Sequence, residues 1–139
     1  MKTSIHLTAS LILAALLYPL LSWKALFILA GGVLIDVDHY FWYAYKYKNL
    51  NLIKSYEFFI KNLEVNDFTN VKGVVLIFHT IEFLLIMVLF SFYNKFALLF
   101  TIGLLSHYLL DFIWFYFILK RFILNHSIIL WIIKNKQKL

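Results

Sequence analysis

The chain carries histidines and carboxylates inside stretches that are otherwise almost entirely apolar. These residues are His6, Asp36, Asp38, His39, His79, Glu82, His107 and Asp111. No Lys or Arg lies within the same stretches as a counter-ion, and buried carboxylates without a cation repel one another or are forced neutral. Imidazole and carboxylate are natural ligands of divalent metals. The residue types therefore predict a metal site for one or two divalent ions, with Zn²⁺ as the expected metal.

Spacing places one histidine and one carboxylate together on each of three expected helices. Residues three or four apart share a helix face, and the pairs that satisfy this are Asp36–His39, His79–Glu82 and His107–Asp111. In a regular helix Asp38 points away from the Asp36–His39 face. It joins the same site only if the backbone unwinds there, or it serves another ligand direction. As the carboxylate left over from the pairs, Asp38 is the candidate catalytic residue, acting as a bridging ligand or a general base.

Composition sets the environment of these residues. Of 139 residues, 63% are hydrophobic, 20% aromatic and only 14% charged. A soluble domain of this size cannot bury so much apolar surface, and a disordered chain is poor in apolar residues. The absence of cysteine excludes disulfides and thiolate metal sites. A single integral membrane domain over residues 1–139 remains, with an all-α fold.

Four apolar stretches are long enough to cross a bilayer as helices, which takes roughly 20 residues. They cover residues 7–23, 25–45, 73–93 and 96–119, and they predict a four-helix transmembrane bundle. The apolar run 122–133 is too short to span and is expected to be an interfacial helix that contains His126. Within the polar loop 46–72, residues 53–60 form either an amphipathic helix on the membrane surface or a solvated linker. Gly32 and Gly103 each precede a candidate ligand by four residues, and should let neighbouring helices approach closely.

Basic residues indicate the orientation. Of the 13 Lys and Arg residues, all except Lys24 and Lys95 fall on one side of four spans. Lys and Arg are retained on the cytoplasmic side, so both termini and the loop 46–72 are expected in the cytoplasm, in a multi-pass inner-membrane protein. The net charge of +6 is then a topology signal, and no nucleic-acid partner is needed to explain it. At 1.5 Å per residue, most candidate ligands lie about 6–14 Å from the cytoplasmic edge.

Two motifs resemble those of the small membrane-bound metal-dependent hydrolases of the YdjM type. The first runs from Gly31-Gly32 to Asp36-Val37-Asp38-His39, and the second is Gly103-Leu104-Leu105-Ser106-His107-Tyr108-Leu109-Leu110-Asp111. The family positions filled here are those of His6, Asp36, Asp38, His39, His79, His107 and Asp111. The family is similar to zinc-dependent phospholipase C and related nucleases. This resemblance implies a multi-zinc site and phosphoester chemistry.

Some positions depart from the family pattern. Ile35 stands where the family usually has Pro, and no basic residue follows His79. Glu82 stands in for a second histidine a few residues after His79. These departures keep a metal ligand but remove a cation that could hold a phosphate. Fewer residues therefore indicate the substrate class than indicate the metal site.

The leading hypothesis is a metal-dependent hydrolase that acts at the cytoplasmic membrane face, with membrane lipid as its partner and a lipid phosphoester as a possible substrate. The alternative is a membrane protein that binds or transports a metal ion or protons without hydrolysis. A di-iron oxidase needs more histidines than the five present. A structural subunit with a closed polar network is a further alternative, and the oligomeric state is left open.

Overall fold

The computed structural model describes residues 1–64, 74–118, 120 and 126–136. These residues form helices, with no β-strand among them. The α-helices are α1 (Thr3–Leu21), α2 (Leu26–Val33), α3 (Val37–Tyr47), α4 (Leu52–Glu64), α5 (Ile81–Ser91), α6 (Lys95–Ile113) and α7 (Ile128–Lys136). Tight turns occupy Ser22–Ala25, Leu34–Asp36 and Ile77–His79, and a π-helical turn, Trp114–Ile118, extends α6. The all-α class predicted from the sequence is confirmed.

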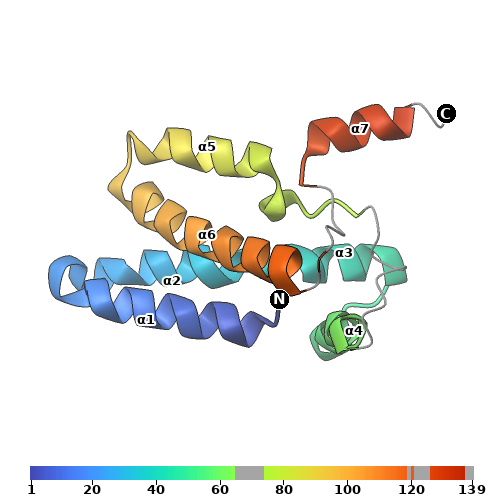
Figure 1. The fold of residues 1–139 in the computed structure, drawn as a ribbon, viewed down its shortest axis with the longest axis horizontal. Coiled ribbons are helices and arrows are strands. Elements are labelled where there is room, and N and C mark those ends of the chain that lie inside the picture. Colours follow the sequence, from blue (N-terminus) through green and yellow to red (C-terminus); the bar gives the residue numbers. More distant parts are fainter. Residues whose placement is uncertain (65–73, 119, 121–125, 137–139) are drawn as a thin grey trace.

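Helices α1, α2, α5 and α6 lie side by side, and α3 continues in the direction of α2 (Figure 1). Helix α6 packs against both α2 and α5, while α1 packs against α2. The closest approach lies between α2 and α6, where a Cβ on Gly103 would overlap the carbonyl oxygen of Ile28 and crowd the nitrogen of Gly32. A Cβ on Gly32 would in turn overlap the hydroxyl of Ser10 on α1. The glycines therefore set the spacing of three helices, as their positions in the sequence indicate.

The turns joining α1 to α2 and α5 to α6 lie at the same end of the bundle (Figure 1). Aromatic rings connect them: the centroid of Phe96 lies 4.7 Å from that of Phe27 and 5.9 Å from that of Trp23. The side chain of Asn94 caps α6 by accepting hydrogen bonds from the first backbone N–H groups of that helix. Lys24 and Lys95 consequently share one end of the helices, which agrees with their separation from the other basic residues in the sequence.

The third apolar stretch differs from its prediction. The sequence predicts one helix over residues 73–93, but α5 begins only at Ile81. Thr80 ends the preceding segment in an extended conformation (φ −103°, ψ 150°), and its hydroxyl accepts a hydrogen bond from the N–H of Phe83. This N-cap stops α5 from extending toward His79. His79 therefore sits in a 3-10 turn outside the helix, where it does not share a helix face with Glu82.

The polar loop and the C-terminal segment both contain helices. Residues 52–64 form α4, so a helix is present where the sequence predicts one over residues 53–60. Of the segment predicted over 122–133, residues 122–125 lie outside the described part of the chain, and α7 covers Ile128–Lys136.

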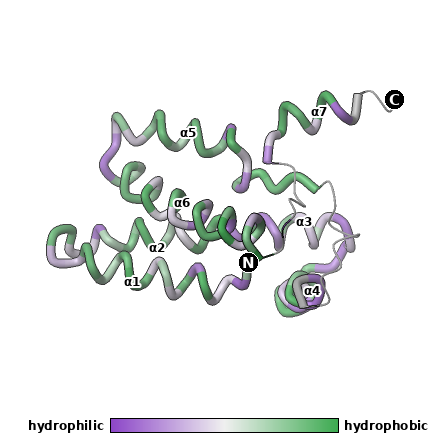
Figure 2. Tube along the Cα trace, viewed as in Figure 1, coloured by the Kyte–Doolittle hydropathy of each residue, from purple (hydrophilic) through white to green (hydrophobic). Residues whose placement is uncertain are grey.

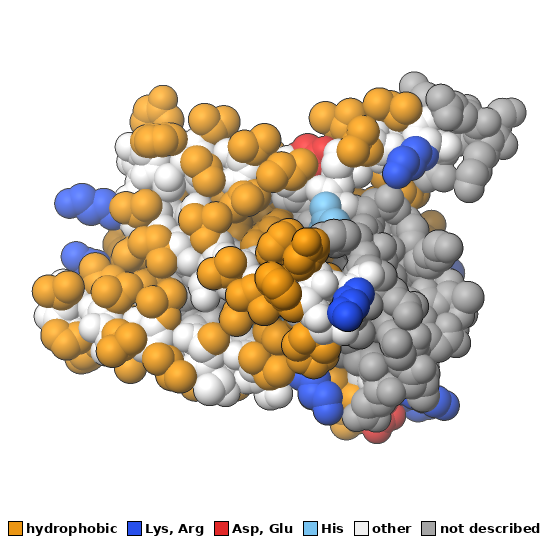
Figure 3. All heavy atoms as spheres, in the orientation of Figure 1, with side chains coloured by type: hydrophobic (Ala, Val, Ile, Leu, Met, Phe, Trp, Pro, Cys, Tyr) orange, Lys and Arg blue, Asp and Glu red, His pale blue; other side chains and the backbone are white. Residues whose placement is uncertain are grey.

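The described residues expose many of their large apolar side chains and bury several polar ones. Large apolar side chains point outward, including Leu16 (71% exposed) and Leu20 (82% exposed), whereas His6 and His107 are each 1% exposed. The apolar residues run along all the bundle helices (Figure 2), and hydrophobic side chains cover the face formed by α1, α5 and α6 (Figure 3). Two helical stretches, Thr3–Tyr47 and Lys95–Ile118, are long and apolar enough to cross a membrane.

The glycine contact gives a test of the packing. Gly103→Ala is expected to destabilise the protein by about 1–3 kcal/mol, because the added methyl group forces α6 away from the backbone of Ile28. Leu105→Ala is the control, since Leu105 lies on the same helix with its side chain 47% exposed. Thermal unfolding of the detergent-solubilised variants measures the difference. Equal midpoints for Gly103→Ala and the wild type would contradict the close approach of α2 and α6.

Candidate metal centre

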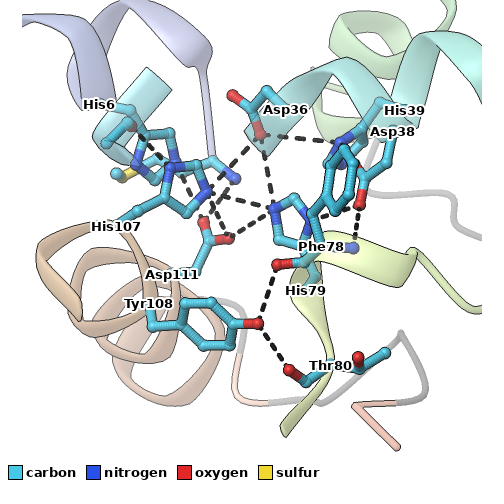
Figure 4. A network of polar contacts seen from close by, with 12 residues as sticks. His6, Asp36, Asp38, His39, Phe78, His79, Thr80, His107, Tyr108 and Asp111 are labelled. Carbon is cyan, nitrogen blue, oxygen red and sulfur yellow. Dashed lines mark hydrogen bonds and ion pairs between the residues drawn. The ribbon is translucent and has the colours of Figure 1, made fainter. Parts of the chain in front are cut away.

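Four side chains from three segments bring one ligand atom each close together: Asp36, His79, and His107 with Asp111 on α6 (Figure 4). The Nε2 atoms of His79 and His107 lie 3.2 Å apart. Asp36 Oδ1 lies 3.5 Å from His79 Nε2 and 3.6 Å from His107 Nε2. Asp111 Oδ2 lies 3.8 Å and 3.4 Å from the same two nitrogens. A tetrahedral ion with ligands at about 2.0–2.1 Å has ligand atoms about 3.4 Å apart, so these five separations are compatible with a bound divalent ion.

Hydrogen bonds on the far side of each imidazole fix its tautomer. His107 Nδ1 donates to the carbonyl oxygen of Gly32 at 2.9 Å, and a carbonyl can only accept. His79 Nδ1 lies 3.0 Å from Asp38 Oδ2 and donates to that carboxylate. When both rings are neutral, both Nε2 atoms present lone pairs, and these face each other in a site where both rings are buried. A cation bound between them would turn this contact into coordination.

Asp38 orients histidines in the structure. Its Oδ2 accepts hydrogen bonds from His79 and from the backbone N–H of Phe78, and its Oδ1 lies 3.0 Å from His39 Nδ1. With both oxygens engaged, Asp38 holds the ring planes of two histidines from two segments. This arrangement is typical of a carboxylate that supports a metal-binding histidine. The sequence predicts Asp38 as a bridging ligand or a general base, and the contacts add an orienting role to those.

The backbone between α2 and α3 explains how Asp36 and Asp38 face the same site. Val33 leaves helical geometry (φ −126°, ψ −46°), and Leu34–Asp36 form a 3-10 turn before α3 begins at Val37. A 3-10 turn has fewer residues per turn than an α-helix, so it changes the angular register of the residues that follow. The α-helix is thus interrupted before Asp36, and the two carboxylates meet opposite nitrogens of one ring: Asp38 at His79 Nδ1 and Asp36 at His79 Nε2.

A second group of ligand atoms adjoins the first through Asp111. His6 Nε2 lies 3.2 Å from Asp111 Oδ1, and the His6 ring stacks on the ring of His107 with centroids 3.6 Å apart. The α-amino nitrogen of Met1 lies 3.1 Å from the same Asp111 oxygen. Neither His6 nitrogen makes a well-aligned hydrogen bond to any described residue, and the same is true of Asp36 Oδ2. Buried polar atoms normally have partners, so His6 Nδ1 and Asp36 Oδ2, which have none among the described residues, point to a ligand.

Three overlapping groups in the described residues are close enough to hold an ion. They are His6–His107–Asp111, Asp36–His79–His107 and Asp38–His39–His79. Every candidate ligand named from the sequence belongs to one of them except Glu82. Exposure of the side chains is 25% for His39, 16% for Asp36 and 14% for Asp111, against 0% for His107. The cluster is therefore most enclosed at His107 and most exposed at His39.

Glu82 lies elsewhere, because its carboxylate caps α7. It accepts hydrogen bonds from the Ser127 hydroxyl and from the backbone N–H groups of Ile128 and Ile129. A carboxylate at a helix N-terminus is stabilised by the unpaired N–H groups and the helix dipole. The spacing from His79 places Glu82 in the site only on a continuous helix, and Thr80 interrupts that helix. The main chain of His126 is held nearby, where its carbonyl accepts a hydrogen bond from Ile81.

Tyr108 is a site residue that sequence reasoning missed. Its hydroxyl lies 2.9 Å from the carbonyl oxygens of both Phe78 and Thr80, which flank His79. The candidate ligand His79 lies outside any α-helix, and Tyr108 fixes the peptide segment that carries it. The position of Tyr108 directly after His107 in the sequence was the available signal, but an adjacent residue on a helix normally faces another direction.

Comparisons with protein-family models, curated proteins and solved structures found no match to this chain. The function is therefore inferred from the geometry of the cluster.

Removal of the Tyr108 hydroxyl tests its role. Tyr108→Phe is expected to weaken metal binding about 10-fold, in the range for residues that support ligands, because the His79 segment loses its anchor. Tyr116→Phe is the matched control on the exposed side of the adjoining π-helical turn. Titration of the metal-free protein with Co²⁺ gives the affinity, and the visible absorption bands report ligand geometry. Identical affinities and spectra for both variants would contradict a positioning role.

Proposed function

We propose that this chain is an integral membrane protein whose bundle helices cross the bilayer, with both termini and residues 46–72 at the cytoplasmic face. The exposed apolar surface of the described residues and the two long apolar helical stretches support this proposal. The separation of Lys24 and Lys95 from the other basic residues supports the orientation. The candidate ligands then lie toward the cytoplasmic end of the bundle, because the turns that carry Lys24 and Lys95 form the opposite end.

The cluster binds a divalent ion in this proposal, with Zn²⁺ as the favoured metal. His79, His107, Asp36 and Asp111 supply the ligands, and the group around His6 offers a place for a second ion that shares Asp111. The single observation that carries the proposal is the pair of Nε2 atoms 3.2 Å apart, each with its Nδ1 committed to an acceptor. Only nitrogen and oxygen ligands are present, which suits zinc in a catalytic site.

The activity proposed for this centre is hydrolysis of a phosphoester. Bound there, zinc would supply a water of lowered pKa and polarise the scissile bond. The Asp36 Oδ2 atom has no hydrogen-bond partner among the described residues, so it is available to accept the proton of that water. Asp38 holds the rings of His79 and His39 in place, and His39 stands at the exposed edge of the cluster, where it can donate a proton to the leaving group.

The depth of the site favours a lipid substrate. The open side of the cluster is formed by Asp36 and His39, close to the start of α3, and α3 extends to the polar loop. In the proposed orientation this side is at the level of lipid head groups, where phosphoesters are located. The resemblance to phospholipase-like zinc enzymes supports the same substrate class.

A non-enzymatic alternative has one observation in its favour. His39, Asp38 and His79 form a continuous chain of contacts at 3.0 Å, and the chain continues through His107 to Asp111. Such chains carry protons in membrane proteins. Metal-dependent uptake of protons or metal ions into proteoliposomes, without hydrolysis of phosphoesters, would favour this function over hydrolysis.

Substitution of the ligands tests the leading proposal. His107→Ala and Asp36→Ala are expected to lose stoichiometric zinc and phosphoesterase activity together, because each removes a ligand atom from the centre. Glu82→Ala is expected to retain zinc, since Glu82 caps α7 and makes no contact in the cluster. Metal analysis of the purified variants and hydrolysis of a short-chain phospholipid measure the two properties.

The result that would contradict the proposal is stoichiometric zinc in His107→Ala. Loss of zinc in Glu82→Ala, with zinc retained in the other two variants, would instead indicate that Glu82 is a ligand, as helix periodicity predicts. Zinc bound by the wild type without hydrolysis of any phosphoester would leave the metal site standing and remove the proposed activity.

A further inference from the structure

Helix α4 packs against the candidate metal centre with one of its faces. Ser55 and Asn62 are buried on this face, and Phe58 and Phe59 pack between them. The ring of Phe59 meets the ring of His39 edge-on, with centroids 4.8 Å apart. Because His39 also contacts Asp38, α4 is linked to the cluster through a single aromatic contact.

A second face of α4 is apolar and uncovered by any described residue. Leu52, Ile53 and Tyr56 are 65%, 68% and 50% exposed. At about 100° per residue, these three side chains and Ile60 fall within an arc of about 100°. Exposed charged side chains occupy a third face, which carries Lys54, Glu57 and Lys61. An uncovered apolar face beside a charged face is typical of helices that lie in the plane of a membrane interface.

The direction of α4 agrees with such a location. Figure 1 shows α4 end-on, whereas α1, α2 and α6 run across the view. The axis of α4 is therefore roughly perpendicular to the bundle helices. If those helices follow the membrane normal, α4 lies parallel to the membrane surface.

The neighbouring end of α3 has the composition of a membrane–water boundary. The ammonium group of Lys46 lies 4.7 Å from the ring centroid of Trp42, and that of Lys48 lies 4.5 Å from the ring centroid of Tyr45. Trp, Tyr and Lys are the residues that anchor helices at head-group level. The loop that follows leads directly into α4, so α4 begins at the same depth.

We propose that α4 lies in the lipid head-group layer with Leu52, Ile53 and Tyr56 inserted among the lipids, and that its Phe59 face holds the open edge of the His–Asp cluster at that level. This inference rests on the proposed membrane-spanning bundle. It assigns the occupant of the apolar face of α4 as the bilayer interface. It also places His39 and Asp36 in the layer where phospholipid head groups are found.

The chain offers a direct test because it contains no cysteine. Ile53→Cys and Lys54→Cys place a nitroxide label on the apolar and the charged face of α4, at adjacent positions of one helix. Each variant is reconstituted into phosphatidylcholine vesicles, and its collision rates with oxygen and with a water-soluble nickel chelate are measured. We expect the label at Ile53→Cys to collide mainly with oxygen, which concentrates in lipid. The label at Lys54→Cys should collide mainly with the nickel chelate.

Two outcomes overturn the inference. If both labels collide equally with the nickel chelate, α4 is surrounded by water. If the label at Ile53→Cys is shielded from both reagents and shows spin–spin broadening that disappears on dilution with unlabelled protein, the apolar face binds a second copy of the chain. The zinc content of the same samples reports on the proposed metal centre independently. Normal zinc together with a water-exposed α4 would refute this inference and leave the metal site standing.

Discussion

The structure depends on two imidazole nitrogens that face each other in an apolar frame. His79 Nε2 and His107 Nε2 approach to 3.2 Å while both rings are almost fully buried. In water such lone pairs would be solvated, but here the Nδ1 atoms are bonded to Gly32 and Asp38 and cannot exchange roles with the Nε2 atoms. A shared proton or a bound cation relieves this contact, and the carboxylates of Asp36 and Asp111 beside the two nitrogens make the point suitable for a divalent cation.

The helical frame makes this pairing possible through its glycines. Gly103 lets α6 approach the backbone of α2 without a side chain between them. The same approach brings the carbonyl oxygen of Gly32 to the Nδ1 of His107, four residues further along α6. Close helix packing and ligand orientation thus have a common origin. A larger residue at Gly103 would change the tautomer-fixing hydrogen bond as well as the packing.

The sequence predicted the all-α class and the gathering of histidines and aspartates from three apolar stretches, because residue type and depth depend only on composition and spacing. The prediction that Glu82 shares a helix face with His79 was wrong, because helix periodicity applies only where the helix is continuous. Thr80 caps α5 after His79 and so interrupts it. The sequence left the role of Asp38 open, because the 3-10 turn over Leu34–Asp36 has no distinctive residue pattern. Tyr108 was missed for a related reason: its partners are backbone carbonyls, which the sequence does not mark.

A metal ion bound between His79, His107, Asp36 and Asp111 is the basis of the proposed function. X-ray absorption at the zinc edge of the purified wild-type protein examines that ion itself. We expect zinc surrounded by nitrogen and oxygen ligands at about 2.0–2.2 Å, with the multiple-scattering signature of two or more imidazoles and no sulfur. Protein that carries no zinc after exposure to it, or zinc without imidazole scattering, would show that the cluster is not a zinc site.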